Sequence, residues 1–103
     1  MERKTNIFCL IPSLSDIKDG KLYEILRAVL GDSIEKDLTL RTLRMESKTS
    51  RIIFGCCRQE TLCFGGFLID MAIIATPNIT EEWEKFLRYK TSAANGIMLR
   101  MEM

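Results

Sequence analysis

The sequence of 103 residues contains no histidine. Imidazole is the usual base of serine and cysteine hydrolases and a frequent zinc ligand, so histidine-activated nucleophiles and histidine-ligated zinc sites are excluded. The phosphate loops G-x-x-x-x-G-K-[ST] and G-x-G-x-x-G are also absent, and the pair Gly65-Gly66 does not replace them. We therefore expect a non-enzymatic protein with no metal and no other cofactor.

The chain also lacks an excess of charge of either sign, because 15 basic and 14 acidic side chains give a formal net charge of +1. This balance argues against a partnership with nucleic acid or an anionic bilayer that depends on the charge of the whole chain. Local patches of charge stay open as an alternative. The length and an apolar content of 47% fit one core, so we expect residues 1–103 to form a single domain.

Long apolar runs are missing as well. The longest, Leu62 to Ala75, falls short of the roughly 20 residues that a transmembrane helix needs, and Gly65-Gly66 and Asp70 interrupt it. The early run from Ile7 ends at Pro12 without a small-residue cleavage site, so we interpret it as a strand and not as a signal peptide. We expect no transmembrane segment and a cytoplasmic location.

Cysteine is present at four positions, all inside apolar runs: Cys9, Cys56, Cys57 and Cys63. Their spacing is not that of a secreted disulfide scaffold, and no C-x-x-C pair suits a tetrahedral metal. Free cysteine packs as a small hydrophobe. We expect four buried, reduced thiols.

Two apolar runs, Ile52 to Cys57 and Leu62 to Ala75, are apolar at nearly every position and predict strands covered on both faces. Helical spacing predicts one helix over Lys21 to Leu30, between Asp19 and Gly31, and a second that starts at an Asn78 cap. The phase of the apolar pattern slips near Arg41-Thr42 and predicts a bulge there. The expected strands are Thr5 to Ile11, Leu38 to Glu46, Arg51 to Cys57, Leu62 to Ala75 and Ile97 to Met103.

The order of these elements predicts an α+β fold of two layers. We expect a mostly antiparallel five-stranded sheet with two helices on one face, in the order β-α-β-β-β-α-β. The three middle strands would form a meander. The last strand follows a helical crossover, so it could lie parallel to the long strand before it.

Two helices on one face would leave the other face of an apolar sheet bare, and exposed apolar patches of that size usually mark association sites. We therefore expect a protein-binding or self-assembly module that acts through a sheet face or strand edge, as a homodimer or docked on another protein. The order of elements and the apolar sheet are similar to those of small self-associating viral matrix and accessory proteins, a similarity of fold alone. The expected contact residues are Phe54, Phe64, Phe67, Ile69 and Ile73.

A basic segment supports an alternative function. Residues 41–58 hold five cations against one acid, Glu46, and could bind the phosphates of nucleic acid or of an anionic surface. The other interpretation is a solvated sheet edge that lysine and arginine protect from edge-to-edge pairing. The aromatic residues Phe54, Phe64 and Phe67 lie in apolar runs and are not interleaved with these charges as a base-stacking surface would need. The five cations are Arg41, Arg44, Lys48, Arg51 and Arg58.

Asp70 is the only charged residue inside the predicted long strand. A buried lone carboxylate would point to a small enzyme that uses Asp70 with a nearby lysine or tyrosine. An acid at the solvated edge of a strand would have no such role. Both interpretations stay open at the level of sequence.

Overall fold

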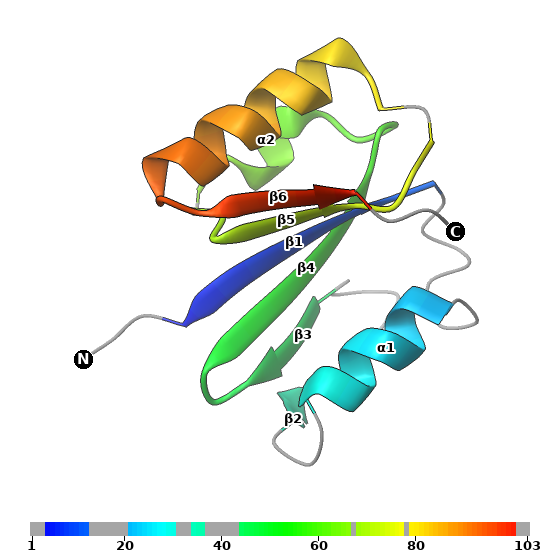
Figure 1. Cartoon of the computed structure of the whole chain (residues 1–103), viewed down its shortest axis with the longest axis vertical. Helices are drawn as coiled ribbons and strands as arrows, with labels where there is room; N and C mark the ends of the chain where they lie inside the picture. The colour runs from blue at the N-terminus through cyan, green and yellow to red at the C-terminus, as the bar shows by residue number, and fades with distance from the viewer. Residues whose placement is uncertain are drawn as a thin grey trace.

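Figure 1 shows the computed structural model of the chain, which describes residues 4–12, 21–30, 34–36, 44–66, 68–77 and 79–100. These residues form a mixed sheet, two α-helices and one short 3-10 helix, and they confirm the α+β class. The elements in chain order are β1 (Thr5–Ile11), α1 (Lys21–Leu30), β2 (Ile34–Lys36), β3 (Arg44–Ser47), β4 (Ser50–Cys56), η3 (Thr61–Phe64), β5 (Met71–Ile74), α2 (Glu81–Ala93) and β6 (Ile97–Arg100).

The sheet has six strands in the order β2-β3-β4-β1-β5-β6. Five of them overlap the segments predicted as strands, and the sixth, the three-residue β2, was not predicted. Strand β1 pairs in parallel with both β4 and β5, and β5 pairs in parallel with β6, so β6 confirms the parallel option for the last strand. Only the β2–β3 and β3–β4 pairs are antiparallel. The prediction of a mostly antiparallel sheet is therefore wrong.

The sheet is mostly parallel because β1 lies in its middle, between β4 and β5. Its residues from Phe8 to Ile11 are all buried, so this strand is apolar on both faces and belongs in the middle of the sheet. It separates β4 from β5, which the sequence suggested were neighbours in a meander. The connection from β4 must then cross over β1, and a crossover joins parallel strands.

The predicted strand from Leu62 to Ala75 is divided in the structure. Its first part is the 3-10 helix η3, and only Met71–Ile74 is extended and paired. Gly65 and Gly66 follow η3 in a turn, which ends the local structure before the chain reaches β5. Because η3 lies outside the sheet, Leu62 and Cys63 are exposed.

The two helices cover opposite faces of the sheet, so the expectation of both helices on one face is wrong. Leu26 of α1 packs in a core with Cys9 and Phe54, whereas Trp83 and Leu87 of α2 pack in a second core on the other side of the strands. The crossover through α1 steps from β1 towards β4, and the crossover through α2 steps from β5 to β6, in the opposite direction. Two crossovers of the same hand that step in opposite directions place their helices on opposite faces.

Helix α1 has the predicted bounds, although its expected ends, Asp19 and Gly31, lie outside the described residues. Helix α2 begins after Thr80, whose hydroxyl oxygen accepts a hydrogen bond from the Trp83 N–H at 3.2 Å. Thr80 thus takes the capping role predicted for Asn78, which is itself outside the described residues. The predicted bulge near residues 41–42 is also outside them.

The outer face of α2 carries two ion pairs. Glu81 and Lys85 approach to 3.2 Å, and Glu84 and Arg88 approach to 2.8 Å, each at the i, i+4 spacing. The helix therefore presents charge to solvent and an apolar stripe to the sheet. At its end, Asn95 adopts a left-handed conformation (φ 54°) and turns the chain into β6.

Candidate functional site

Four of the five predicted contact residues are buried within the chain. Phe54 and Ile73 belong to the core on the α1 face, and Phe64 and Ile69 belong to the core on the α2 face. Phe67 lies outside the described residues. Because each face of the sheet has its own helix, these four side chains do not form the bare surface that a single helical layer would have left.

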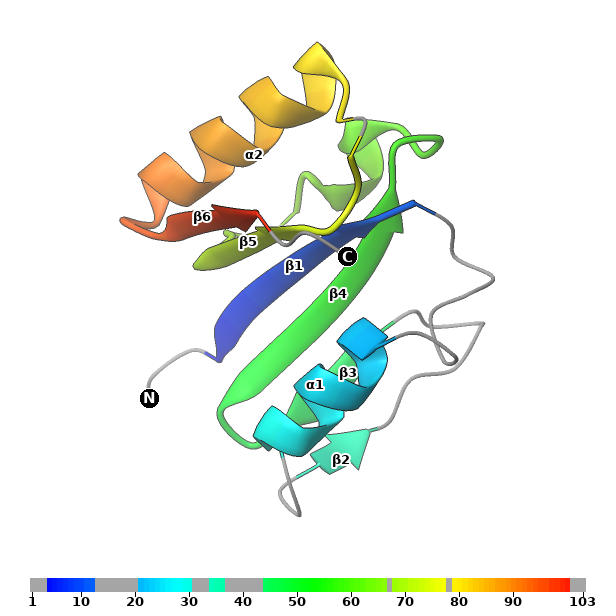
Figure 2. The same ribbon diagram turned by 45° about the vertical axis from the view of Figure 1, so that its right-hand side comes forward.

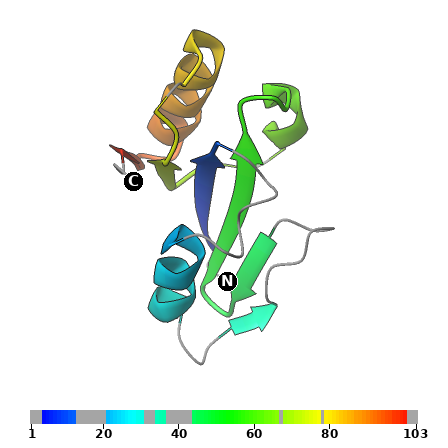
Figure 3. The same ribbon diagram turned by 90° about the vertical axis from the view of Figure 1, so that its right-hand side faces the viewer.

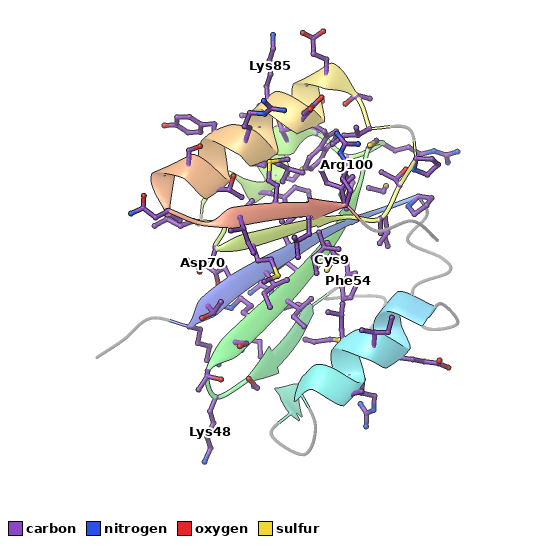
Figure 4. All side chains as sticks on the ribbon, in the orientation of Figure 1. Cys9, Lys48, Phe54, Asp70, Lys85 and Arg100 are labelled. Carbon is purple, nitrogen blue, oxygen red and sulfur yellow. The ribbon has the colours of Figure 1, made fainter. Side chains whose placement is uncertain are left out.

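A different part of the same sheet is uncovered. The register places Phe54, Cys9, Ile73 and Leu99 in one row across β4, β1, β5 and β6, on the face that α1 covers. The first three are buried, at 1%, 0% and 7% exposure, whereas Leu99 is 45% exposed. Figure 2 shows α1 in front of β3, with β5 and β6 well to one side of it, and Figure 4 shows Cys9 and Phe54 between the sheet and α1. The cover of α1 therefore ends before β6.

Along the neighbouring row, the exposure of the side chains also increases towards β6. Ile52 is buried, Ile7 and Met71 are half-buried, and Ile97 at the end of the row is 51% exposed. We call the surface formed by Ile97 and Leu99, with the half-buried Ile7 and Met71 beside them, the bare flank. It is apolar and lies at an edge of the sheet.

The backbone of β6 is also open along this edge. The Ile97 N–H donates to the Asp70 carbonyl at 3.0 Å, so Ile97 turns its backbone groups towards β5. Backbone groups alternate in direction along a strand, so those of Met98 and Arg100 face away from β5. In the described part of the chain, no strand lies beyond β6.

Sequence reasoning named neither Ile97 nor Leu99 as a contact residue. Alternation along the predicted last strand places Ile97 and Leu99 on one side. It does not say whether that side is covered, because alternation alone does not say how far a helix extends across a sheet. The missing information was the lateral position of α1 over β3 and β4.

The basic residues of segment 41–58 are divided by the structure. Arg44 and Arg51 approach the same acid, Glu46, at 4.0 and 2.9 Å, and Lys48 is exposed in the adjoining turn. Arg58 follows the opposite end of β4, and Arg41 lies outside the described residues.

Lys4, which sequence reasoning did not select, joins this group by approaching Glu46 at 3.3 Å. Burial by itself would raise the pKa of the Glu46 carboxyl, but the hydrogen bonds and charges of Arg51 and Lys4 outweigh burial and hold that pKa below its ordinary value. Glu46 is therefore an anion that holds cations from two other strands or their ends. A signal was present in the sequence, because Glu46 is the single acid of the basic segment.

Asp70 joins three strands at the point where β5 begins. Its carboxylate accepts a hydrogen bond from the Asn6 N–H at 2.8 Å, and its own N–H donates to the Asn6 carbonyl at 2.9 Å. Its carbonyl accepts from Ile97 in β6, as described above. Asp70 is partly exposed, and these hydrogen bonds link β1, β5 and β6.

Of the four cysteines, which were all expected to be buried, only Cys9 and Cys56 are. Burial raises the pKa of the Cys9 thiol well above its ordinary value, which keeps it protonated and unreactive. Cys57 is half-buried, and Cys63 is exposed because it lies on η3 and not in a strand. Within the described residues, no group of three or more acidic or cysteine side chains is placed to hold a metal ion.

No helix among the described residues has the length and apolar character needed to cross a membrane. Comparison of the chain with protein-family models, with curated proteins and with solved structures finds no match in any of the three.

Proposed function

We propose that this protein is a small non-enzymatic self-assembly module whose β6 edge pairs with β6 of a second copy. The observation that carries the proposal is the gradient of exposure along the two rows of the sheet, which ends in half-exposed Ile97 and Leu99 at an open strand edge. Exposed apolar side chains beside unpaired strand backbone are a template for pairing with another strand.

An antiparallel pairing of two β6 strands satisfies both features. Residues directly opposite each other in an antiparallel pair lie on the same face, so the bare flanks of the two copies become continuous. The outward backbone groups of Met98 and Arg100 then find partners across a two-fold axis. Such an interface is isologous and closes at two copies, because each copy contributes the same edge.

The charges of β6 favour a second copy as the occupant. Arg100 is the only charged residue of the strand, and Glu84 of α2 holds it on the opposite face from the bare flank, at 3.5 Å. Neither copy therefore buries an unpaired charge when two flanks meet. A two-fold axis at Arg100 would oppose like charges, so we expect the axis nearer to Met98 and Leu99.

The test is the effect of Leu99→Lys on the oligomeric state, measured by sedimentation velocity over a range of concentrations. The wild-type chain should form a dimer, and the substitution should weaken it by at least about tenfold, because it removes apolar burial from both copies and places a charge at the edge.

The matched control is Leu62→Lys. Leu62 is 84% exposed on η3, away from the bare flank, so its replacement by lysine should leave the dimer unchanged. A wild-type chain that stays monomeric at every concentration would contradict the proposal. Equal weakening by both substitutions would contradict it as well, because the association would then depend on general hydrophobicity.

A further inference from the structure

Glu46 holds three cations at the β3–β4 hairpin. Arg51 Nε donates to Glu46 Oε1 at 2.9 Å, Lys4 Nζ donates to Oε2 at 3.3 Å, and Arg44 Nη1 lies 4.0 Å from Oε1. Glu46 and Arg51 are direct partners in the strand pairing, and their neighbours Met45 and Ile52 belong to the α1 core. The cluster therefore lies on the face away from α1, and Figure 3 shows β3 at the end of the molecule remote from α2.

The two guanidinium groups have donors to spare. Arg51 binds Glu46 through Nε, and in the described part of the chain neither its terminal amines nor the guanidinium N–H groups of Arg44 donate a hydrogen bond. Both side chains are partly open to solvent, at 33% and 46% exposure. A planar guanidinium with free donors matches the oxygens of a phosphoryl group.

Among the described residues, the cluster has an excess of positive charge, because one carboxylate faces three cations. The anchored carboxylate reduces the freedom that Arg51 and Lys4 would lose on binding an anion. Lys48 adds a fourth positive charge at the hairpin turn, where Figure 4 shows it pointing away from the sheet.

We propose that Arg44 and Arg51, positioned by Glu46 and flanked by Lys4, form a binding site for one phosphoryl group of the phosphomonoester or pyrophosphate class. Because both arginines approach the same carboxylate oxygen, they are close enough for one such group to contact both. The site lies on the β3–β4 hairpin and is independent of the bare flank on β6.

A single phosphoryl group fits the cluster better than the backbone of a nucleic acid does. Arg58 lies at the far end of β4, so the described cations do not form a continuous track for a polymer. Among the residues whose side chains the structure describes, the one strongly exposed aromatic residue is Tyr89, on α2, so these residues offer no exposed aromatic surface at the hairpin for bases to stack on.

The test is a titration of the full chain with pyrophosphate, followed through the side-chain Nε–H resonances of its arginines. The Arg51 resonance should shift and saturate, and Arg44→Gln should weaken binding by about tenfold, because a charged hydrogen-bond donor is lost. Arg58→Gln is the matched control, because it removes the same charge from another exposed arginine and should leave the affinity unchanged.

Failure to saturate would overturn the proposal, and so would equal weakening by the two substitutions. Parallel titrations with duplex DNA and with anionic lipid vesicles identify the source of the phosphate. Binding of either polyanion without saturable binding of pyrophosphate would overturn the single-group site. The self-association measurements use different variants, so the two proposals can fail separately.

Discussion

Gly96 occupies a position where no side chain fits. A Cβ atom built on it would run into the carbonyl groups of Asp70 and Ile69, which approach the turn between α2 and β6. The Gly96 N–H also donates to the Thr91 carbonyl at 2.7 Å, so the backbone cannot move aside without losing a bond. The start of β6, and with it the bare flank, depends on this close approach.

Gly96→Ala should therefore destabilise the fold by roughly 1–3 kcal/mol, the usual range for overpacking a site that cannot relax. Gly66→Ala is the control, because a Cβ at Gly66 meets nothing within 4 Å. Urea unfolding of the two variants measures the difference. A loss of stability in Gly66→Ala as large as in Gly96→Ala would contradict the packing argument.

Glu46 links the stability of the fold to pH. Its pKa is lowered in the folded state, so the unfolded chain takes up a proton first as the pH falls, and stability falls with it. The contribution of the Glu46 carboxylate is present above its ordinary pKa of 4.5 and is lost as the pH drops through the lower folded value.

The measurement is urea unfolding of the wild type and of Glu46→Gln as the pH is lowered. The wild type should be the more stable of the two near neutral pH, and the gap between them should narrow below about pH 4.5. A gap that stays constant with pH would show that the ion pairs do not stabilise the folded state.

At the level of single elements, η3 connects the sheet to α2. Phe64 packs edge-on against Phe8 of β1, with ring centroids 4.9 Å apart, and lies 5.7 Å from the ring of Trp83 in α2. These aromatic contacts are favourable beyond the burial of their area. The 3-10 helix thus adds Phe64 to the core between β1 and α2.

Phe64→Ala should cost about 3 kcal/mol of unfolding free energy, as expected for a large aromatic residue in a core, and Leu62→Ala should cost almost nothing. In a continuous strand Leu62 and Phe64 would share one face and one degree of burial. In η3 one is 84% exposed and the other 8%. Urea denaturation distinguishes the two arrangements, and equal losses would favour the strand.

Helices were predicted from sequence better than strands. The apolar spacing of Lys21–Leu30 set the bounds of α1, and helical spacing also predicted α2. Each of these signals is local, because the residues that share a helical face are three or four positions apart. The run from Leu62 to Ala75 was wrongly predicted to be one strand, because continuous apolar character fits a buried strand and a buried 3-10 turn equally well.

At the level of the whole molecule, the features that could not be predicted from the sequence are those that depend on the order of the strands. The contact residues Phe54 and Ile73 were expected on a bare face, and that expectation followed from placing both helices on one side. The opposite placement depends on β1 entering between β4 and β5, which no local pattern encodes. The inference that one face of the apolar sheet lacks a cover is wrong for the strands on which it was based, and the exposed apolar residues lie instead on the edge strand, at Ile97 and Leu99.

The residues of the candidate phosphate site around Glu46 also could not all be predicted from the sequence. Arg44 and Arg51 were selected as cations of one segment, and strand pairing brings them to one acid. Lys4 is distant in sequence and reaches Glu46 only because β1 lies beside β4. Such partners follow from topology and not from composition.

The central position of β1 has a further consequence for how the molecule is made. Its register partners begin at Ser50 on one side and at Met71 on the other, so β1 cannot have both of its edges paired until β5 has been synthesised. Such non-local closure slows folding. Until β5 is synthesised, one edge of the apolar strand β1 stays unpaired. That edge can pair with an unpaired strand of another nascent chain and start aggregation.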